Sequence, residues 1–266
     1  MIAPPMGEVY QPFVDTSAVR TDSAKLREQL ARDGYLFIRA LAPRDTVMSL
    51  RRAIIDVLAR AGWIDAKTET WTGAGPYTEG DSEYMAVYKQ ILHLPEFKSF
   101  ADNPVFLKLA SDLLDGPAMA HKLRIGRVTF PNNVAQTTAA HQDFQYIRGT
   151  PETYTIWTPI GDCSAELGGL AVLRGSHRAG FIEHKLFEGK KYAGHGLSEE
   201  SLPNGEGSEW HSGDFAAGDV LLFHSHTIHK ARPNLTKDRL RLSTDNRYQR
   251  VGDAIAPVSQ GTHYNL

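Results

Sequence analysis

Two side chains that can bind a metal stand two positions apart in the segment 137–144, which reads Thr-Thr-Ala-Ala-His-Gln-Asp-Phe. They are His141 and Asp143. On a β-strand, residues i and i+2 point to the same face, so this imidazole and this carboxylate would converge. A third ligand is available in His229, which ends the segment Gly-Asp-Val-Leu-Leu-Phe-His-Ser-His-Thr-Ile-His. Two histidines and a carboxylate on one face of an octahedron leave three positions open, as in non-haem iron(II) oxygenases.

The elements that must position these ligands are short strands, which begin at about residue 119. Runs rich in β-forming residues, separated by Gly, Pro and Asn, cover residues 121–130, 154–160, 169–173, 220–224 and 240–248. Several short strands of this kind are typical of a jelly roll. We therefore expect a mostly β fold with a helical cover and a double-stranded β-helix (jelly-roll) core.

The first half of the chain is mainly helical. Apolar spacing predicts a helix over 23–34, capped by Ser23 and stopped by Gly34, then a strand over 35–41 and a helix over 46–61. Residues 83–115 read as two further helices, the second capped by Asn103 ahead of Pro104. Because no linker is visible in the 266 residues, we expect one domain over 1–266, with a largely helical part over 1–118 and the metal-binding β core over 119–250.

Composition excludes several classes of function. The formal charge is −2, so no electrostatic attraction to nucleic acid or to an anionic membrane is expected. No apolar stretch approaches the length of a membrane span, and the N-terminus lacks the pattern of a signal peptide. The single cysteine, Cys163, can form neither an internal disulfide nor a cysteine-based zinc site. A cytoplasmic enzyme that acts on a small molecule is the expectation, and the sequence leaves its oligomeric state open.

Two long segments lack periodicity and are rich in Gly: residues 64–82 and residues 189–213. Long irregular segments in a compact domain are often functional. Both can cover a pocket, the first with Trp71 and Tyr77 as contact residues, although for the first a solvated surface loop is an equally good interpretation.

Several motifs follow one another in a fixed order. After the His-Gln-Asp segment come Tyr-Thr-Ile-Trp-Thr-Pro over 154–159 and Glu-Leu-Gly-Gly-Leu-Ala-Val-Leu-Arg-Gly-Ser-His-Arg over 166–178. The segment 218–234 and the run Asp-Arg-Leu-Arg-Leu-Ser over 238–243 complete the series. The ordered set resembles the phytanoyl-CoA dioxygenase family of Fe(II)/2-oxoglutarate-dependent oxygenases, from about residue 119 to 250.

The resemblance implies a ligand set and a co-substrate site. His141, Asp143 and His229 match the iron ligands, and an arginine after the distal histidine matches the residue that binds the outer carboxylate of 2-oxoglutarate. A guanidinium suits that task because it offers a charged, bidentate fork. The family places this arginine near residue 240, which is a leucine here. Arg239 and Arg241 flank it, and the charged run around them favours Arg241.

Other residues of the same strands are weaker candidates. Trp157 matches a tryptophan that lies beside the co-substrate in some family members. Thr155 would share its strand face and could donate a hydrogen bond to a carboxylate, and ordinary strand packing is the alternative for both. Arg127 either lines the pocket or forms a structural ion pair. His224 and His226 alternate off the face of His229 in an extended strand and are not expected to be ligands.

The expected reaction, by the resemblance, consumes Fe(2+)-bound 2-oxoglutarate and O2, releases succinate and oxidises a substrate C–H bond. A carboxylate at Asp143 favours hydroxylation over halogenation, while desaturation, epimerisation and cyclisation stay open. Residues that could wall a site for a medium-sized organic molecule are aromatic: Trp71, Tyr77, Phe144, Tyr146 and Trp210. Analogy with relatives suggests natural-product biosynthesis.

Two other classes of protein fit the same ligands. Zinc also accepts two histidines and one carboxylate, as in a metal-dependent cupin-like hydrolase or isomerase. A non-catalytic jelly-roll binding module is the second alternative, because fold does not dictate function. An arginine that binds 2-oxoglutarate separates the oxygenase from both.

Overall fold

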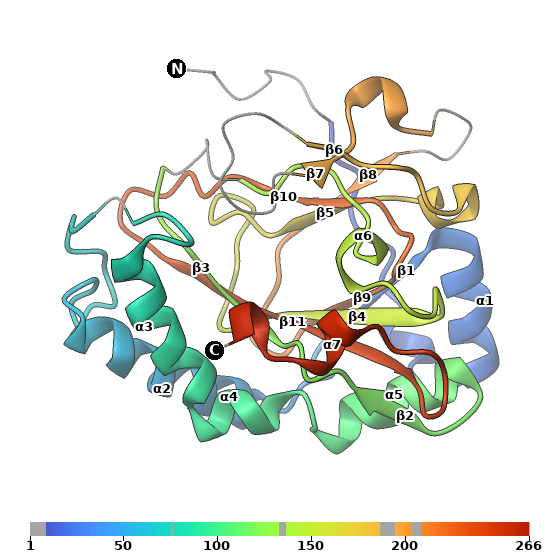
Figure 1. Ribbon diagram of the computed structural model, residues 1–266, viewed down its shortest axis with the longest axis horizontal. Coiled ribbons are helices and arrows are strands. Elements are labelled where there is room, and N and C mark those ends of the chain that lie inside the picture. The colour runs from blue at the N-terminus through green and yellow to red at the C-terminus, as the bar shows by residue number, and fades with distance from the viewer. Residues whose placement is uncertain (1–8, 76, 133–136, 187–194, 204–208, 266) are drawn as a thin grey trace.

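A computed structural model describes residues 9–75, 77–132, 137–186, 195–203 and 209–265 (Figure 1). Within these ranges, no helix is both long enough and apolar enough to cross a membrane. The helices are α1 (Ser23–Asp33), α2 (Arg44–Arg60), α3 (Ser82–His93), α4 (Pro95–Phe100), α5 (Pro104–Leu114), α6 (Phe144–Ile147) and α7 (Pro257–Gln260), with 3-10 turns at Ser17–Val19, Ser176–Ala179, Glu199–Ser201 and His263–Asn265.

A six-stranded antiparallel sheet forms the centre of the molecule. Its strands run in the order β1 (Tyr35–Ile38), β9 (Val220–His224), β4 (Thr153–Pro159), β11 (Arg241–Arg250) and β2 (Ala118–Ala120), and β3 (Ile125–Thr129) also pairs with β11. The longest strand is β11, which pairs with β4 on one side and with β3 and β2 on the other. It therefore connects β4 to β3 and β2 within the sheet.

A smaller antiparallel sheet has the order β10 (His229–Ala231), β5 (Leu170–Leu173) and β8 (Trp210–His211). A hairpin of β6 (Lys185–Leu186) and β7 (His195–Gly196) lies beside it. In Figure 1 the small sheet lies above the large one, and helices α2 to α5 run along the opposite side of the large sheet.

The two faces of the large sheet pack against different partners, as the two-residue period of a strand requires. On β1 and β9, Leu36 and Leu222 belong to the core shared with the helices. Their neighbours Phe37 and Leu221 belong to a second core, which also contains Val172 of the small sheet. The inner face of the large sheet is thus covered by the small sheet, and the outer face is covered by the helices. Two facing antiparallel sheets with this cover confirm the predicted jelly-roll core.

Several predicted elements differ in detail. The cap of α1 is Asp22, whose side chain accepts a hydrogen bond from the backbone of Lys25; Ser23 is the first helical residue. Residues 83–115 hold three helices where the sequence predicts two, because Pro95 begins a short helix of its own at the end of α3. The cap at Asn103 is confirmed by its bond to the Val105 backbone.

Candidate active site

His141 and His229 are brought together by the backbone. They form an antiparallel bridge in which each backbone N–H donates to the other residue's carbonyl, both at 3.0 Å. His229 is the first residue of β10, in the small sheet, so the prediction that it extends the strand of His224 is wrong. The chain turns between the two histidines, and that turn carries His229 to the second sheet.

Asp143 reaches the same point from a helix start. Its backbone is helical (φ −59°, ψ −30°), and its carbonyl accepts the N–H of Ile147 in the short helix α6. The prediction that His141 and Asp143 share a strand is therefore wrong, although their side chains do converge. His141 lies in a single β-bridge, and Asp143 lies at the start of a helix.

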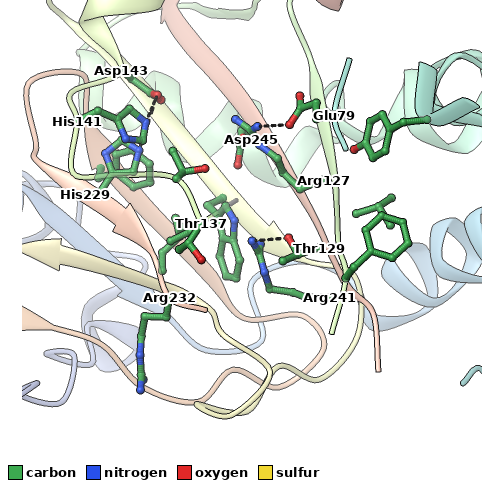
Figure 2. Close-up of a pocket in the computed structure, with 18 of the residues that line it drawn as sticks. Glu79, Arg127, Thr129, Thr137, His141, Asp143, His229, Arg232, Arg241 and Asp245 are labelled. Carbon is green, nitrogen blue, oxygen red and sulfur yellow. Dashed lines mark hydrogen bonds and ion pairs between the residues drawn. The ribbon is translucent and has the colours of Figure 1, made fainter. Parts of the chain in front are cut away.

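The three side chains form one buried cluster. The Nε2 atoms of His141 and His229 each lie 3.8 Å from Oδ1 of Asp143, and one possible ligand atom from each residue lies within 4.8 Å of the others. Figure 2 shows both rings and the carboxylate turned toward one another at one end of a cavity. Among the described residues, no other group of three His, Cys, Asp or Glu side chains has this arrangement.

The tautomers of the two histidines suit metal binding. Nδ1 of His141 donates to the carbonyl of Ala139 at 2.8 Å, and Nδ1 of His229 donates to the carbonyl of Thr227 at 3.0 Å. Each Nε2 is then left with a lone pair, as a metal requires. Burial lowers the pKa of His141 well below its usual value, and the nearby His229 ring lowers it further; burial also lowers the pKa of His229, so both rings are neutral and available to a metal.

The carboxylate of Asp143 is held from its other side. The Thr155 hydroxyl donates to Oδ2, and Arg247 donates from Nε to Oδ2 at 3.2 Å and from Nη2 to both oxygens at 3.1 Å. Although burial opposes it, the positive charge of Arg247 holds the pKa of Asp143 below its usual range. The carboxylate is therefore ionised and oriented before any metal arrives. The sequence suggested the co-substrate as the partner of Thr155; in the structure its hydroxyl donates to Asp143 instead.

Arg247 is a site residue that the sequence interpretation missed. Alternation along β11 places Arg241, Asp245 and Arg247 on one strand face, toward the cavity, while Leu242 and Tyr248 pack into the core shared with the helices. Counting every second residue along the strand from Arg241 leads to Arg247 on the same face, and this signal was present in the sequence.

The structure separates the two candidate arginines of the co-substrate site. Arg241 is 4% exposed, lines the cavity next to the histidines, and donates to the hydroxyls of Ser243 (2.7 Å) and Thr129 (2.9 Å). Its Nε has no hydrogen-bond partner. Arg239 is exposed and does not line this cavity. Figure 2 shows the Arg241 guanidinium across the cavity from the three metal-ligand candidates.

This cavity has a volume of about 100 Å³. Trp157 lines it, packed edge-on against Phe215 with ring centroids 4.8 Å apart, and the Arg241 guanidinium lies 6.0 Å from the centre of the Trp157 ring. An anionic, chelating co-substrate fits this donor set, because a buried guanidinium with an unpartnered N–H faces a metal-ligand cluster.

Arg127 both lines the site and forms ion pairs. Its Nε lies 3.2 Å from Asp245 and its Nη1 lies 3.4 Å from Glu79. Burial would lower its pKa, but these two carboxylates outweigh that effect and raise it. Both interpretations of Arg127 from the sequence are therefore correct.

A second cavity, of about 620 Å³, also has His141 and Asp143 in its lining. Of the predicted aromatic walls, Tyr146 lines this cavity and Tyr77 lines the smaller one. Three others lie elsewhere among the described residues: Trp71 donates to the Ala74 carbonyl, Phe144 packs on Phe181 and His226, and Trp210 stacks with Lys230.

The two long segments contribute unequally to the site. Residues 64–82 supply Tyr77, which stacks on Trp63 with ring centroids 4.5 Å apart, and Glu79, which lines both cavities. For residues 189–213, much of the predicted cover (189–194 and 204–208) lies outside the described residues.

The chain matches one protein family and is similar in sequence to two hydroxylases. The family described as Phytanoyl-CoA dioxygenase (PhyH) matches residues 30–242. A 1-deoxypentalenic acid 11-beta-hydroxylase from Streptomyces exfoliatus is 26% identical over 254 residues, which cover 92% of this chain and 87% of the relative. A hydroxylase of the same name from Streptomyces arenae is 26% identical over 258 residues, covering 92% and 87%.

Solved structures share the fold. The non-heme alpha ketoglutarate dependent carbocyclase SnoK from nogalamycin biosynthesis superposes with a TM-score of 0.62 at 20% identity, covering 92% of this chain and 90% of its own. The epimerase SnoN, in complex with Fe3+, alpha ketoglutarate and nogalamycin RO, gives a TM-score of 0.57 at 19% identity, covering 90% and 87%. At these identities the likeness concerns the fold alone.

Proposed function

Because this chain belongs to the phytanoyl-CoA dioxygenase family of iron(II)- and 2-oxoglutarate-dependent oxygenases, we propose that it hydroxylates a medium-sized organic molecule in natural-product biosynthesis. Its iron ligands are His141, Asp143 and His229, and Arg241 binds the outer carboxylate of 2-oxoglutarate. The family is the one that the ordered motifs of the sequence indicated.

One observation carries the proposal: the buried cation Arg241 faces the same cavity as the three ligand side chains. A buried charge without an ionised partner is costly, so such a residue indicates an anionic ligand. A zinc hydrolase or an isomerase on this fold needs no such cation. For this reason the oxygenase is favoured over both alternatives and over a binding module.

When bound, iron(II) supplies the activation of O2 that couples the decarboxylation of 2-oxoglutarate to substrate oxidation. The chain's residues prepare for this chemistry. The carbonyls of Ala139 and Thr227 fix the two imidazole tautomers, while Thr155 and Arg247 orient the Asp143 carboxylate. Such fixed hydrogen bonds require no reorganisation during the reaction.

The remaining residues divide the space around the metal. Arg241 holds the co-substrate in the smaller cavity beside Trp157, and the larger cavity takes the organic substrate. His141, Asp143 and Arg127 line both cavities, so the two molecules meet at the ligand cluster. This meeting point positions a substrate C–H bond and excludes water. A hydroxylation outcome is supported by the names of the two Streptomyces relatives.

The test is turnover of 2-oxoglutarate under ¹⁸O2 by the purified protein with iron(II). The proposal requires succinate that carries one ¹⁸O atom. The Asp143→Ala variant should produce none, because one of its three ligands is gone. Succinate formation by Asp143→Ala at the wild-type rate would reject the ligand assignment, and unlabelled succinate from the wild type would reject the reaction.

A further inference from the structure

The outer wall of the larger cavity comes from the C-terminal segment, beyond the residues 30–242 that the family matches. After β11 the chain turns back and forms α7 and the 3-10 turn His263–Asn265. Figure 1 shows this segment crossing in front of the large sheet. Five of its residues line the cavity: Pro257, Val258, Thr262, His263 and Tyr264.

Three side-chain hydrogen bonds hold this segment in place. The Ser259 hydroxyl donates to the carbonyl of Ile147 at 2.9 Å. The His263 ring lies 2.7 Å from the Tyr88 hydroxyl on α3. The Tyr264 hydroxyl donates to Glu79 at 2.6 Å, and Glu79 in turn pairs with Arg127. The wall is therefore tied to three separate parts of the chain, one of which is the ion-pair chain of the site.

Part of the remaining cavity lining is apolar. Leu123, Ile125 and Ile147 line the cavity and are at most 7% exposed. Val258, on the wall itself, keeps 51% of its surface exposed at the cavity rim. Apolar side chains on both sides of a cavity of about 620 Å³ suit a drug-sized molecule with a hydrocarbon skeleton.

The charges at the inner end of the cavity are already matched. Arg127 pairs with Glu79 and Asp245, and Arg247 pairs with Asp143. Among the described lining residues, no arginine or lysine is left without a carboxylate partner. An anionic substrate group placed here would lose its hydration without meeting an unpaired arginine or lysine, at a cost in binding. The inner end therefore favours uncharged carbon.

We propose that the segment 257–264 is the specificity-determining wall of the substrate chamber, and that the chamber takes a largely apolar, drug-sized molecule whose uncharged skeleton lies between Val258 and Ile125. Any ionised group of that molecule lies toward the outer rim. This inference rests on the proposed function, since the larger cavity is the substrate chamber only if the ligand cluster binds iron.

The test uses a matched pair of exposed valines. Val258 lines the chamber and Val251 does not, yet the two are 51% and 53% exposed. The probe is N-phenyl-1-naphthylamine, a neutral apolar fluorophore, titrated anaerobically into the protein loaded with iron(II) and 2-oxoglutarate. We expect Val258→Trp to weaken probe binding about tenfold or more, because the indole fills the chamber rim, and Val251→Trp to leave it unchanged.

A second probe tests the charge argument. 8-Anilinonaphthalene-1-sulfonate has the same skeleton with one added sulfonate, and the wild type should bind it about tenfold more weakly than the neutral probe. Equal effects of the two valine variants would overturn the assignment of the wall, and binding of the sulfonate that is as tight as that of the neutral probe, or tighter, would overturn the preference for uncharged carbon.

The same samples separate this inference from the proposed function. The visible absorption band of a 2-oxoglutarate–iron(II) chelate should appear in the wild type and in both valine variants. If the band is absent from the wild type, the proposed function fails. If the band is present and Val258→Trp binds the probe as tightly as the wild type does, the proposed function stands and the wall assignment fails.

Discussion

Replacing Arg241 with methionine should remove co-substrate binding while leaving the metal ligands intact. Methionine keeps much of the length of the side chain and removes the charge. In the structure the guanidinium donates hydrogen bonds to the hydroxyls of Ser243 and Thr129, and among the described residues it donates none to the three ligand candidates. The substitution thus separates binding of 2-oxoglutarate from binding of iron.

The expected magnitude follows from burial. Arg241 is 4% exposed, so a carboxylate that binds it is withdrawn from water, and truncating one partner of such a pair costs about 2–5 kcal/mol. A value of about 3 kcal/mol corresponds to binding of 2-oxoglutarate that is about 150-fold weaker. The apo protein, by contrast, should lose little stability, because burial disfavours the charged form of Arg241 and lowers its pKa.

Anaerobic calorimetry measures both quantities. Iron(II) is titrated into the apo protein, and 2-oxoglutarate is then titrated into the iron-loaded protein. The matched control is Arg239→Met, two residues along the chain and exposed, which should bind both ligands as the wild type does. Wild-type affinity for 2-oxoglutarate in Arg241→Met, or a loss confined to Arg239→Met, would show that Arg241 does not bind the co-substrate.

Three further predictions concern the ligands, their support and the wall. His141→Ala and Asp143→Ala should each abolish stoichiometric iron(II) binding by metal analysis, and full occupancy in either would remove that residue from the site. Arg247→Met leaves the buried Asp143 carboxylate without its charged partner, so the apo protein should lose about 3–5 kcal/mol of unfolding free energy. Iron(II) should restore part of that loss, giving a larger metal-induced rise in melting temperature than in wild type; an equal rise would contradict the role. Burial lowers the pKa of His263 from 6.5 to about 3, so its neutral form stabilises the wall fully above pH 6.5, and that stability declines as the pH falls toward 3. Amide exchange in 257–264, corrected for intrinsic rates, should quicken between pH 7.5 and pH 5 and lose this dependence in His263→Gln; no change in the wild type would contradict it.

The parts of the site that the sequence could predict lie on regular strands. The family resemblance pointed to Arg241 and Trp157, and the structure places them in β11 and β4, where the two-residue period of a strand turns both toward the cavity. The same period contains the signal for Arg247, which needs only the parity of β11. Jelly-roll architecture was predictable for the same reason, since it follows from short strands and the turns between them.

The parts that escaped prediction depend on tertiary contacts. Asp143 converges with His141 through a helical turn, and nothing in a His-x-Asp spacing distinguishes that turn from a strand. His229 belongs to a different sheet from His224 because the chain turns between them. The C-terminal wall has no long apolar run, and its position depends on hydrogen bonds to residues far away in the sequence, such as Tyr88 and Glu79.

Anaerobic titration of the apo protein with iron(II), followed by 2-oxoglutarate, tests the central claim most directly. We expect a weak metal-to-ligand charge-transfer band in the visible spectrum that appears only when both are present, because the 2-oxo acid chelates a metal held by His141, Asp143 and His229. No band, together with tight binding of zinc, would contradict 2-oxoglutarate chelation at this site and favour a hydrolase or isomerase in which Arg241 has no co-substrate to bind.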